Sequence, residues 1–97
     1  MKTTDEIISI LRDFKVRTAE KYGILILGLF GSAARGEQDE QSDIDICIKL
    51  REPDYFKRME IKEELEQLFR TKVDVVSLGA IMRDLFRKNL EQDAIFI

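Results

Sequence analysis

The fold is decided by one stretch of the chain, residues 24–50, which reads ILILGLFGSAARGEQDEQSDIDICIKL. Its first seven residues form a nearly unbroken apolar run, which is typical of a β-strand buried on both faces. From Ser42 to Leu50, polar and aliphatic residues alternate, and this alternation predicts a second strand with one face in the core. Between the strands, Gly31 allows a sharp turn and Ser32 can cap a helix of one or two turns, which Gly36 closes.

The flanking sequence predicts helices and further strands. Apolar residues near helical spacing predict a helix over residues 4–22 and another over residues 53–70, which Pro53 and Asp54 begin. The remaining chain predicts a third strand at residues 72–76, a last helix over residues 78–90 and a short strand at residues 94–97 that closes the sheet edge. This order predicts an α/β (α+β) fold, a small mixed β-sheet of three to four strands flanked by helices.

Length and charge limit the possible functions. A chain of 97 residues predicts a single domain, residues 1–97, without room for a separate substrate-binding domain. The chain has 16 basic and 19 acidic residues and a net charge of −3, which argues against binding nucleic acid by bulk positive charge. The longest uncharged run has 13 residues, so we expect no membrane span, and the absence of an export signal together with a lone thiol favours the cytoplasm.

Two residue counts restrict the chemistry. Histidine is absent, which excludes an imidazole base and any histidine-ligated metal. Cys47 is the single cysteine, which excludes an internal disulfide and a zinc site built from several cysteines. Cys47 follows two aspartates on the same strand face and could approach a site there, but we interpret it as a small buried residue.

Three carboxylates are expected at one end of the sheet. Asp43 and Asp45 occupy positions i and i+2 of the second strand, so their side chains share a face, and Asp74 lies in the third strand. The helix between these strands is long enough for a crossover that makes them parallel, which brings all three carboxylates to the same end. A short connection then places Gly31 and Ser32 beside them. Without histidine, carboxylate oxygens suit magnesium, manganese or calcium.

The turn at Gly31 suggests what binds beside the carboxylates. Backbone N–H groups at the start of the Ser32 helix favour anionic oxygens such as those of phosphates. Metal-binding carboxylates that face a phosphate site suggest two-metal phosphoryl or nucleotidyl transfer. A P-loop is excluded because Glu37 stands where its lysine should be, and the glycines do not form the dinucleotide-binding motif.

The motif resembles a known family. Gly31-Ser32, a spacer of ten residues and Asp43-Ile44-Asp45 are similar to the signature of the minimal nucleotidyltransferases of the DNA polymerase β superfamily, and Asp74 matches the family's third aspartate. The resemblance implies a polymerase β-like nucleotidyltransferase fold and covers nearly the whole chain.

The resemblance also implies a role for each matched residue. Asp43, Asp45 and Asp74 are the catalytic and metal-binding residues, with two Mg²⁺ ions, or Mn²⁺, bridging the triphosphate of ATP and Asp74 helping to deprotonate the attacking hydroxyl. Gly31 and Ser32 bind the β- and γ-phosphates. Arg35 either supports these phosphates or forms a surface ion pair with a nearby acid.

The resemblance finally implies a partner. Short members of this family are often encoded beside a HEPN-type ribonuclease toxin, and this chain resembles the antitoxins that transfer AMP from ATP to a tyrosine of that partner. Two alternatives remain: a non-catalytic antitoxin that neutralises its partner by binding, and a nucleotidyltransferase that acts on RNA or a small molecule. We expect no membrane contact and no direct binding of nucleic acid.

The remaining candidate residues have simpler interpretations. The basic residues of the last predicted helix could reach a triphosphate or a partner, but a solvated helix face is favoured: Arg83, Arg87 and Lys88. The acids of the loop are interpreted as solvated: Glu37, Asp39 and Glu40. Four phenylalanines are predicted to be core residues: Phe14, Phe56, Phe69 and Phe86.

Overall fold

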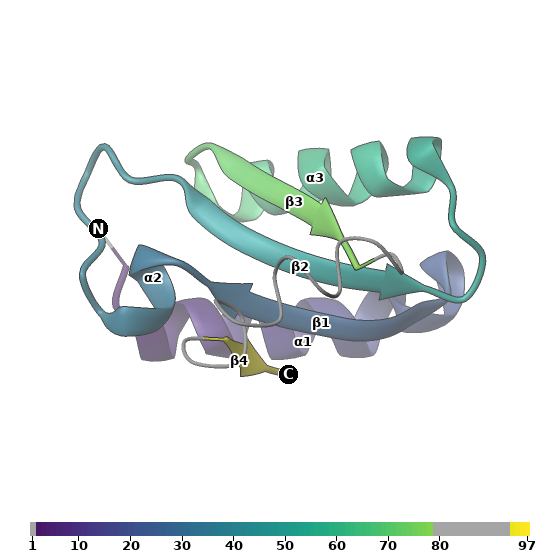
Figure 1. The fold of residues 1–97 in the computed structure, drawn as a ribbon, viewed down its shortest axis with the longest axis horizontal. Helices are drawn as coiled ribbons and strands as arrows, with labels where there is room; N and C mark the ends of the chain where they lie inside the picture. The colour runs from purple at the N-terminus through teal and green to yellow at the C-terminus, as the bar shows by residue number, and fades with distance from the viewer. Residues whose placement is uncertain (1, 79–93) are drawn as a thin grey trace.

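Two long helices cover one face of a four-stranded mixed sheet in the computed structural model (Figure 1). The structure describes residues 2–78 and 94–97. All but the first residue of the predicted helix over residues 78–90 therefore lies outside the described part of the chain, together with its basic residues and Phe86. The elements are α1 (Thr4–Tyr22), β1 (Ile24–Phe30), α2 (Ser32–Arg35), β2 (Ile44–Leu50), α3 (Tyr55–Phe69), β3 (Val73–Ser77) and β4 (Ile95–Phe96). The predicted α/β class with a mixed sheet of three to four strands is confirmed.

The strands are ordered β3-β2-β1-β4 across the sheet. β1 and β2 are antiparallel, whereas β2 and β3 are parallel and are joined by α3, as the crossover argument predicts. β1 therefore ends where β2 and β3 begin, and the register pairs Phe30 with Asp45 and Asp45 with Asp74. The predicted closing strand is also confirmed: β4 pairs with β1, and the Ile97 N–H donates to the Leu27 carbonyl at 2.8 Å.

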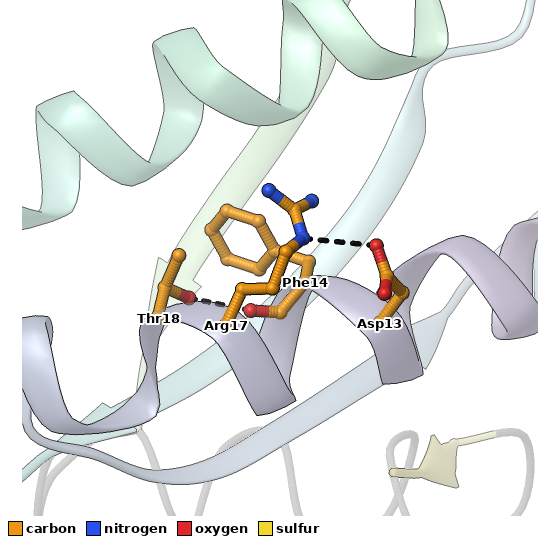
Figure 2. A network of polar contacts seen from close by, with 4 residues as sticks. All are labelled: Asp13, Phe14, Arg17 and Thr18. Atoms are coloured by element: carbon orange, nitrogen blue, oxygen red, sulfur yellow. Dashed lines mark hydrogen bonds and ion pairs between the residues drawn. The ribbon is translucent and has the colours of Figure 1, made fainter.

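Local signals define both ends of α1. The Thr3 hydroxyl accepts from the Glu6 N–H and the Glu6 side chain accepts from the Thr3 N–H, which forms a capping box. Gly23, with φ of 66°, ends the helix in the left-handed conformation. Figure 2 shows the Phe14 ring projecting from α1 toward α3 and the Thr18 hydroxyl donating to the Phe14 carbonyl at 2.7 Å.

The ion pair in Figure 2 lies on the outer surface of α1. Arg17 Nε lies 2.9 Å from Asp13 Oδ2, one helical turn away, and both side chains are more than half exposed. An exposed pair at this spacing stabilises a helix by about 0.3–0.5 kcal/mol. The burial of Phe14 therefore contributes more to holding α1 on the sheet than this pair does.

The core lies between the helices and one face of the sheet. α1 and α3 contribute side chains at helical spacing, and β2 contributes every second residue, as the alternation predicts. Its principal members are Ile7, Leu11, Phe14, Leu27, Leu29, Ile44, Ile46, Ile48, Ile61, Leu65, Phe69 and Val73. Asp45, Cys47 and Lys49 consequently belong to the opposite face of β2.

Two burial predictions need correction. β1 is not buried on both faces throughout, because Leu25 is 47% exposed next to an irregularity in the pairing of β1 with β2. Phe56 is 77% exposed and is not a core residue. It lies five residues before the buried Ile61, which at 3.6 residues per turn places it roughly 140° around α3 from the core face. Phe14 and Phe69 are buried as predicted.

A Pro-Asp sequence begins α3 as predicted. The Asp54 side chain accepts hydrogen bonds from the Phe56 and Lys57 N–H groups, at 2.8 and 3.2 Å, and caps the helix. Within residues 2–78 and 94–97, no helix is long and apolar enough to cross a membrane.

Candidate active site

The three predicted carboxylates converge where β1 ends and where β2 and β3 begin. Asp45 and Asp74 are register partners on adjacent parallel strands, which lie about 4.8 Å apart. Asp43 lies in the loop directly before β2, not inside the strand as predicted, because β2 begins at Ile44. Asp74 is exposed, and Asp43 and Asp45 are half-buried. The sheet topology thus brings together acidic residues that are about 30 positions apart in the chain.

The surroundings of Asp45 disfavour its negative charge. Burial raises the pKa of the Asp45 carboxyl above its ordinary value, and the charges of Asp74 and Asp43 raise this pKa further. The Arg35 charge acts in the opposite direction and only partly offsets them. A carboxylate in these surroundings favours a neighbouring cation.

Gly31 lies directly against the Asp45 carboxylate. Its backbone adopts φ of 73° and ψ of −154°, a conformation that is essentially restricted to glycine. A Cβ atom on Gly31 would collide with Asp45 Oδ2, so the side chain of Asp45 occupies the space that any other residue at position 31 needs. The glycine therefore serves both the turn and the close approach of the backbone to the carboxylate.

The short helix α2 follows Gly31. The Gly31 carbonyl accepts from the Ala34 and Arg35 N–H groups, at 3.1 and 3.3 Å, and Gly36 closes the helix with φ of 73°. The Thr4 hydroxyl donates to the Ala33 carbonyl at 2.6 Å and fixes α2 against the start of α1. Sequence reasoning missed Thr4, because nothing in the local sequence connects it with a residue 29 positions away.

Arg35 forms an ion pair at the edge of this site. Its Nε lies 3.1 Å from Glu37 Oε2, and both side chains are partly exposed. The predicted surface ion pair is therefore observed. Because the Arg35 charge also lowers the pKa of Asp45, the guanidinium lies within electrostatic reach of the carboxylates as well.

Cys47 is separate from this chemistry. Its side chain is fully buried, and burial raises the pKa of its thiol to about 11. It lies opposite Gly28 in the sheet, where a Cβ on Gly28 would contact both its sulfur and the Phe96 ring. The interpretation of Cys47 as a small buried residue is confirmed.

The donor set fits a hard divalent cation. Carboxylates are the ligands that Mg²⁺ prefers, and the charge on Asp45 is only partly offset by Arg35. Across the described residues, no three acidic or cysteine side chains already form a complete metal-ligand set. Mg²⁺ does not need one, because it is usually held by one or two carboxylates together with water and substrate phosphates.

Comparison with known proteins identifies the family. A model described as a nucleotidyltransferase domain matches residues 8–97. The chain belongs to the nucleotidyltransferase domain family. It is 37% identical over 93 residues to the protein adenylyltransferase MntA of Thermococcus cleftensis, covering 95% of this chain and 94% of that protein. It is also 45% identical over 98 residues, 100% of each chain, to a Methanocaldococcus jannaschii protein that is named provisionally as a protein adenylyltransferase.

Solved structures of this family share the fold. A provisionally assigned minimal nucleotidyltransferase superposes with a TM-score of 0.74 at 26% identity, covering 97% of this chain and 95% of that one. A toxin–antitoxin structure with AMP-PNP matches with a TM-score of 0.66 at 23% identity, over 98% and 72% of the two chains. The complex of a tri-AMPylated Shewanella oneidensis HEPN toxin with its MNT antitoxin matches with a TM-score of 0.59 at 23% identity, over 96% and 66%. The resemblance to the minimal nucleotidyltransferases is confirmed.

Proposed function

We propose that this nucleotidyltransferase transfers AMP from ATP to a hydroxyl group of a partner protein. The observation that carries the proposal is the position of Asp45, which lies against the Gly31 turn and is paired in register with Asp74. This arrangement combines a close backbone approach with a carboxylate pair, and both suit a triphosphate that is held through a metal ion. The names of the sequence relatives support the same activity.

Each residue of the site has its own role in the proposed reaction. Asp43, Asp45 and Asp74 would hold two Mg²⁺ ions, which neutralise the charge of the triphosphate and stabilise the charge that develops during transfer. Gly31 and Ser32 bind the β- and γ-phosphates through the turn, and Arg35 adds positive charge beside them. The family resemblance implies these roles, and the positions of Asp45, Asp74 and Gly31 in the fold support them.

The transfer itself is an in-line displacement. The acceptor oxygen forms a bond to the α-phosphorus, and the bond between that phosphorus and the pyrophosphate oxygen breaks. Asp74 is exposed and can receive the acceptor proton as the new bond forms. Pyrophosphate leaves with the electron pair of the broken bond.

The partner we propose is a HEPN-type ribonuclease toxin with a tyrosine as the acceptor, so that the chain acts as an antitoxin. Support comes from the structural neighbours, which include toxin–antitoxin complexes, one of them with an AMPylated HEPN toxin. A tyrosine hydroxyl is a chemically suitable acceptor because its proton is more acidic than that of serine or threonine.

The proposal is tested by incubating the chain with α-labelled ATP, Mg²⁺ and a HEPN toxin from the same genome. We expect label on the toxin with the unaltered chain and none with Asp43→Asn, which removes a metal ligand. Glu40→Gln is the matched control, because it removes an exposed acid of the same loop and should leave labelling unchanged.

Each contrary outcome identifies an alternative. Neutralisation of the toxin that survives Asp43→Asn without any label would support a non-catalytic antitoxin. Label on RNA or on a small molecule instead of protein would show that the acceptor is not a protein.

A further inference from the structure

Within the described residues, a groove runs along the edge of β3 that is not paired with β2 and reaches the last residues of β2. It has a volume of about 650 Å³. One part of it reaches the exposed Asp74 and another reaches the first turn of α3. The residues that define this groove, named here the β3 groove, are Lys49, Tyr55, Arg58, Asp74, Val76 and Ser77.

The backbone of β3 is partly occupied along this edge. Glu66 Oε2 accepts from the Val73 N–H at 3.2 Å, and Arg58 Nη1 donates to the Val75 carbonyl through a long hydrogen bond of 3.4 Å. These α3 side chains occupy outward-facing groups that an added strand would need. These two contacts favour a ligand of the β3 groove that binds through side-chain contacts over one that extends the sheet.

The first turn of α3 offers side chains suited to such contacts. Tyr55 is 60% exposed and stands edge-to-face with the exposed Phe56, with ring centroids 5.8 Å apart. The Arg58 guanidinium lies 5.4 Å from the centroid of the Tyr55 ring. Exposed tyrosine, phenylalanine and arginine side chains are the types enriched at the energetic centres of protein interfaces.

The charge of the β3 groove indicates which polar group its ligand carries. Lys49 and Arg58 both line it, in a chain whose net charge is −3. Two acids line the groove as well: the Asp54 carboxylate is engaged by the N–H groups at the start of α3, and Asp74 belongs to the proposed metal site. A carboxylate on the ligand would complement the two cations.

We propose that the β3 groove binds the segment of the partner protein that carries the acceptor hydroxyl. An apolar side chain of this segment packs on Tyr55 and Phe56, a carboxylate pairs with Lys49 and Arg58, and the hydroxyl lies at the Asp74 end. The inference rests on the proposed function, because Asp74 is the point at which the groove meets the transfer site. It gives the chain a surface that selects the protein acceptor.

The test uses two groove variants of the full chain. Tyr55→Ser with Phe56→Ser removes the exposed rings and leaves the β3 hydrogen bonds intact, and Arg58→Gln removes one cation. The matched control is Val16→Ser with Arg12→Gln, which removes an 84% exposed apolar side chain and an exposed arginine from α1. Circular dichroism and thermal melting establish that each variant folds.

We measure the Kd for the partner by calorimetry, the KM for the partner in AMP transfer, and the affinity for a fluorescent ATP analogue. Each groove variant should raise the Kd and the KM about tenfold or more, with kcat at saturating partner and ATP-analogue affinity within about twofold of the unaltered chain. The α1 control should change none of these quantities.

Failure of the β3 groove and failure of the proposed function are distinguishable. A Kd for the partner that is unchanged in both groove variants overturns the groove, whether or not AMP is transferred. If the unaltered chain binds the partner through the groove but transfers no AMP, the proposed function fails and the docking surface stands.

Discussion

Asp45 and Cys47 lie two residues apart on the same face of β2, but their surroundings are opposite in character. Asp45 is half-buried, lies against the Gly31 turn and faces the like charges of Asp43 and Asp74. Cys47 is fully buried opposite Gly28 and Phe96, and its thiol remains neutral. Two residues along the same face of β2, the surroundings therefore change from a charged site to a closely packed, buried environment.

This difference shows where the fold retains a group that lowers its stability. At Cys47, side chains fill the space and the ionised form is strongly disfavoured. At Asp45, an acidic group is retained although burial and like charges disfavour its ionised form. Retention of an unfavourable charge beside a glycine turn is consistent with selection for binding rather than for stability.

Asp45→Asn should have the largest effect, because it removes the negative charge of Asp45 and keeps the shape of the side chain. We expect AMP transfer to fall by about three orders of magnitude. The raised pKa means that ionised Asp45 lowers the folding stability above that pKa, so in the absence of metal at neutral pH the variant should melt at the same temperature or higher. Transfer assays and thermal melting in a chelator measure both effects. A marked loss of stability without metal would contradict this account of Asp45.

Gly31→Ala tests the contact between the turn and the carboxylate. A Cβ at this position collides with Asp45 and also requires a glycine-only backbone conformation, so transfer should fall by about two orders of magnitude. Gly36→Ala is the control, since Gly36 shares the φ of 73° but its ψ of 21° is tolerated by alanine at a cost of about 1 kcal/mol. Its added Cβ would lie 3.8 Å from the Thr4 hydroxyl oxygen, which is an ordinary van der Waals contact. Equal losses in the two variants would show that the Asp45 contact is unimportant.

The reactivity of Cys47 tests whether this part of the β2 face is closed to solvent. With a pKa of about 11, on the order of one thiol in a thousand is ionised at pH 8, and the side chain is buried, so a thiol reagent should react only when the chain unfolds. The rate of reaction should follow the denaturant dependence of unfolding. Val16→Cys supplies an exposed thiol as the control and should react at once. Immediate reaction of Cys47 in the native chain would contradict its burial.

Arg35→Gln should have the smallest effect. The guanidinium acts on Asp45 but is also paired with Glu37 and is partly exposed, so we expect the KM for ATP to rise about threefold with little change in kcat. Glu37→Gln is the complementary variant, because it releases Arg35 from the ion pair and should leave the KM unchanged or lower it. Steady-state kinetics at several ATP concentrations separates the two parameters, and a KM unaffected by Arg35→Gln would limit Arg35 to the surface pair.

The sequence predicted the site's convergence because topology determines it. The helix over residues 53–70 is long enough to return the chain to a parallel neighbour, which predicts that Asp45 and Asp74 lie near the start of adjacent strands, as they do. The capping and turn signals of the first helix, Gly23 among them, likewise act over a few residues and can be read directly.

What the sequence could not predict depends on long-range packing. The hydrogen bond from Thr4 to the Ala33 carbonyl joins segments that no local pattern connects. The exposure of Phe56 depends on which side of α3 meets the sheet, and an apolar residue in the first turn does not reveal this. The contact between Gly31 and Asp45 also requires the register of β1 and β2, which a motif spacing alone does not give.

The most direct test of the central claim is to locate the metal and the nucleotide on the folded chain. A crystal structure with Mn²⁺ and AMP-PNP, read by the anomalous scattering of manganese, makes that measurement. We predict that manganese is bound to the carboxylates of Asp43 and Asp45, with the triphosphate at the Gly31 turn. Manganese and triphosphate bound away from these residues would contradict it.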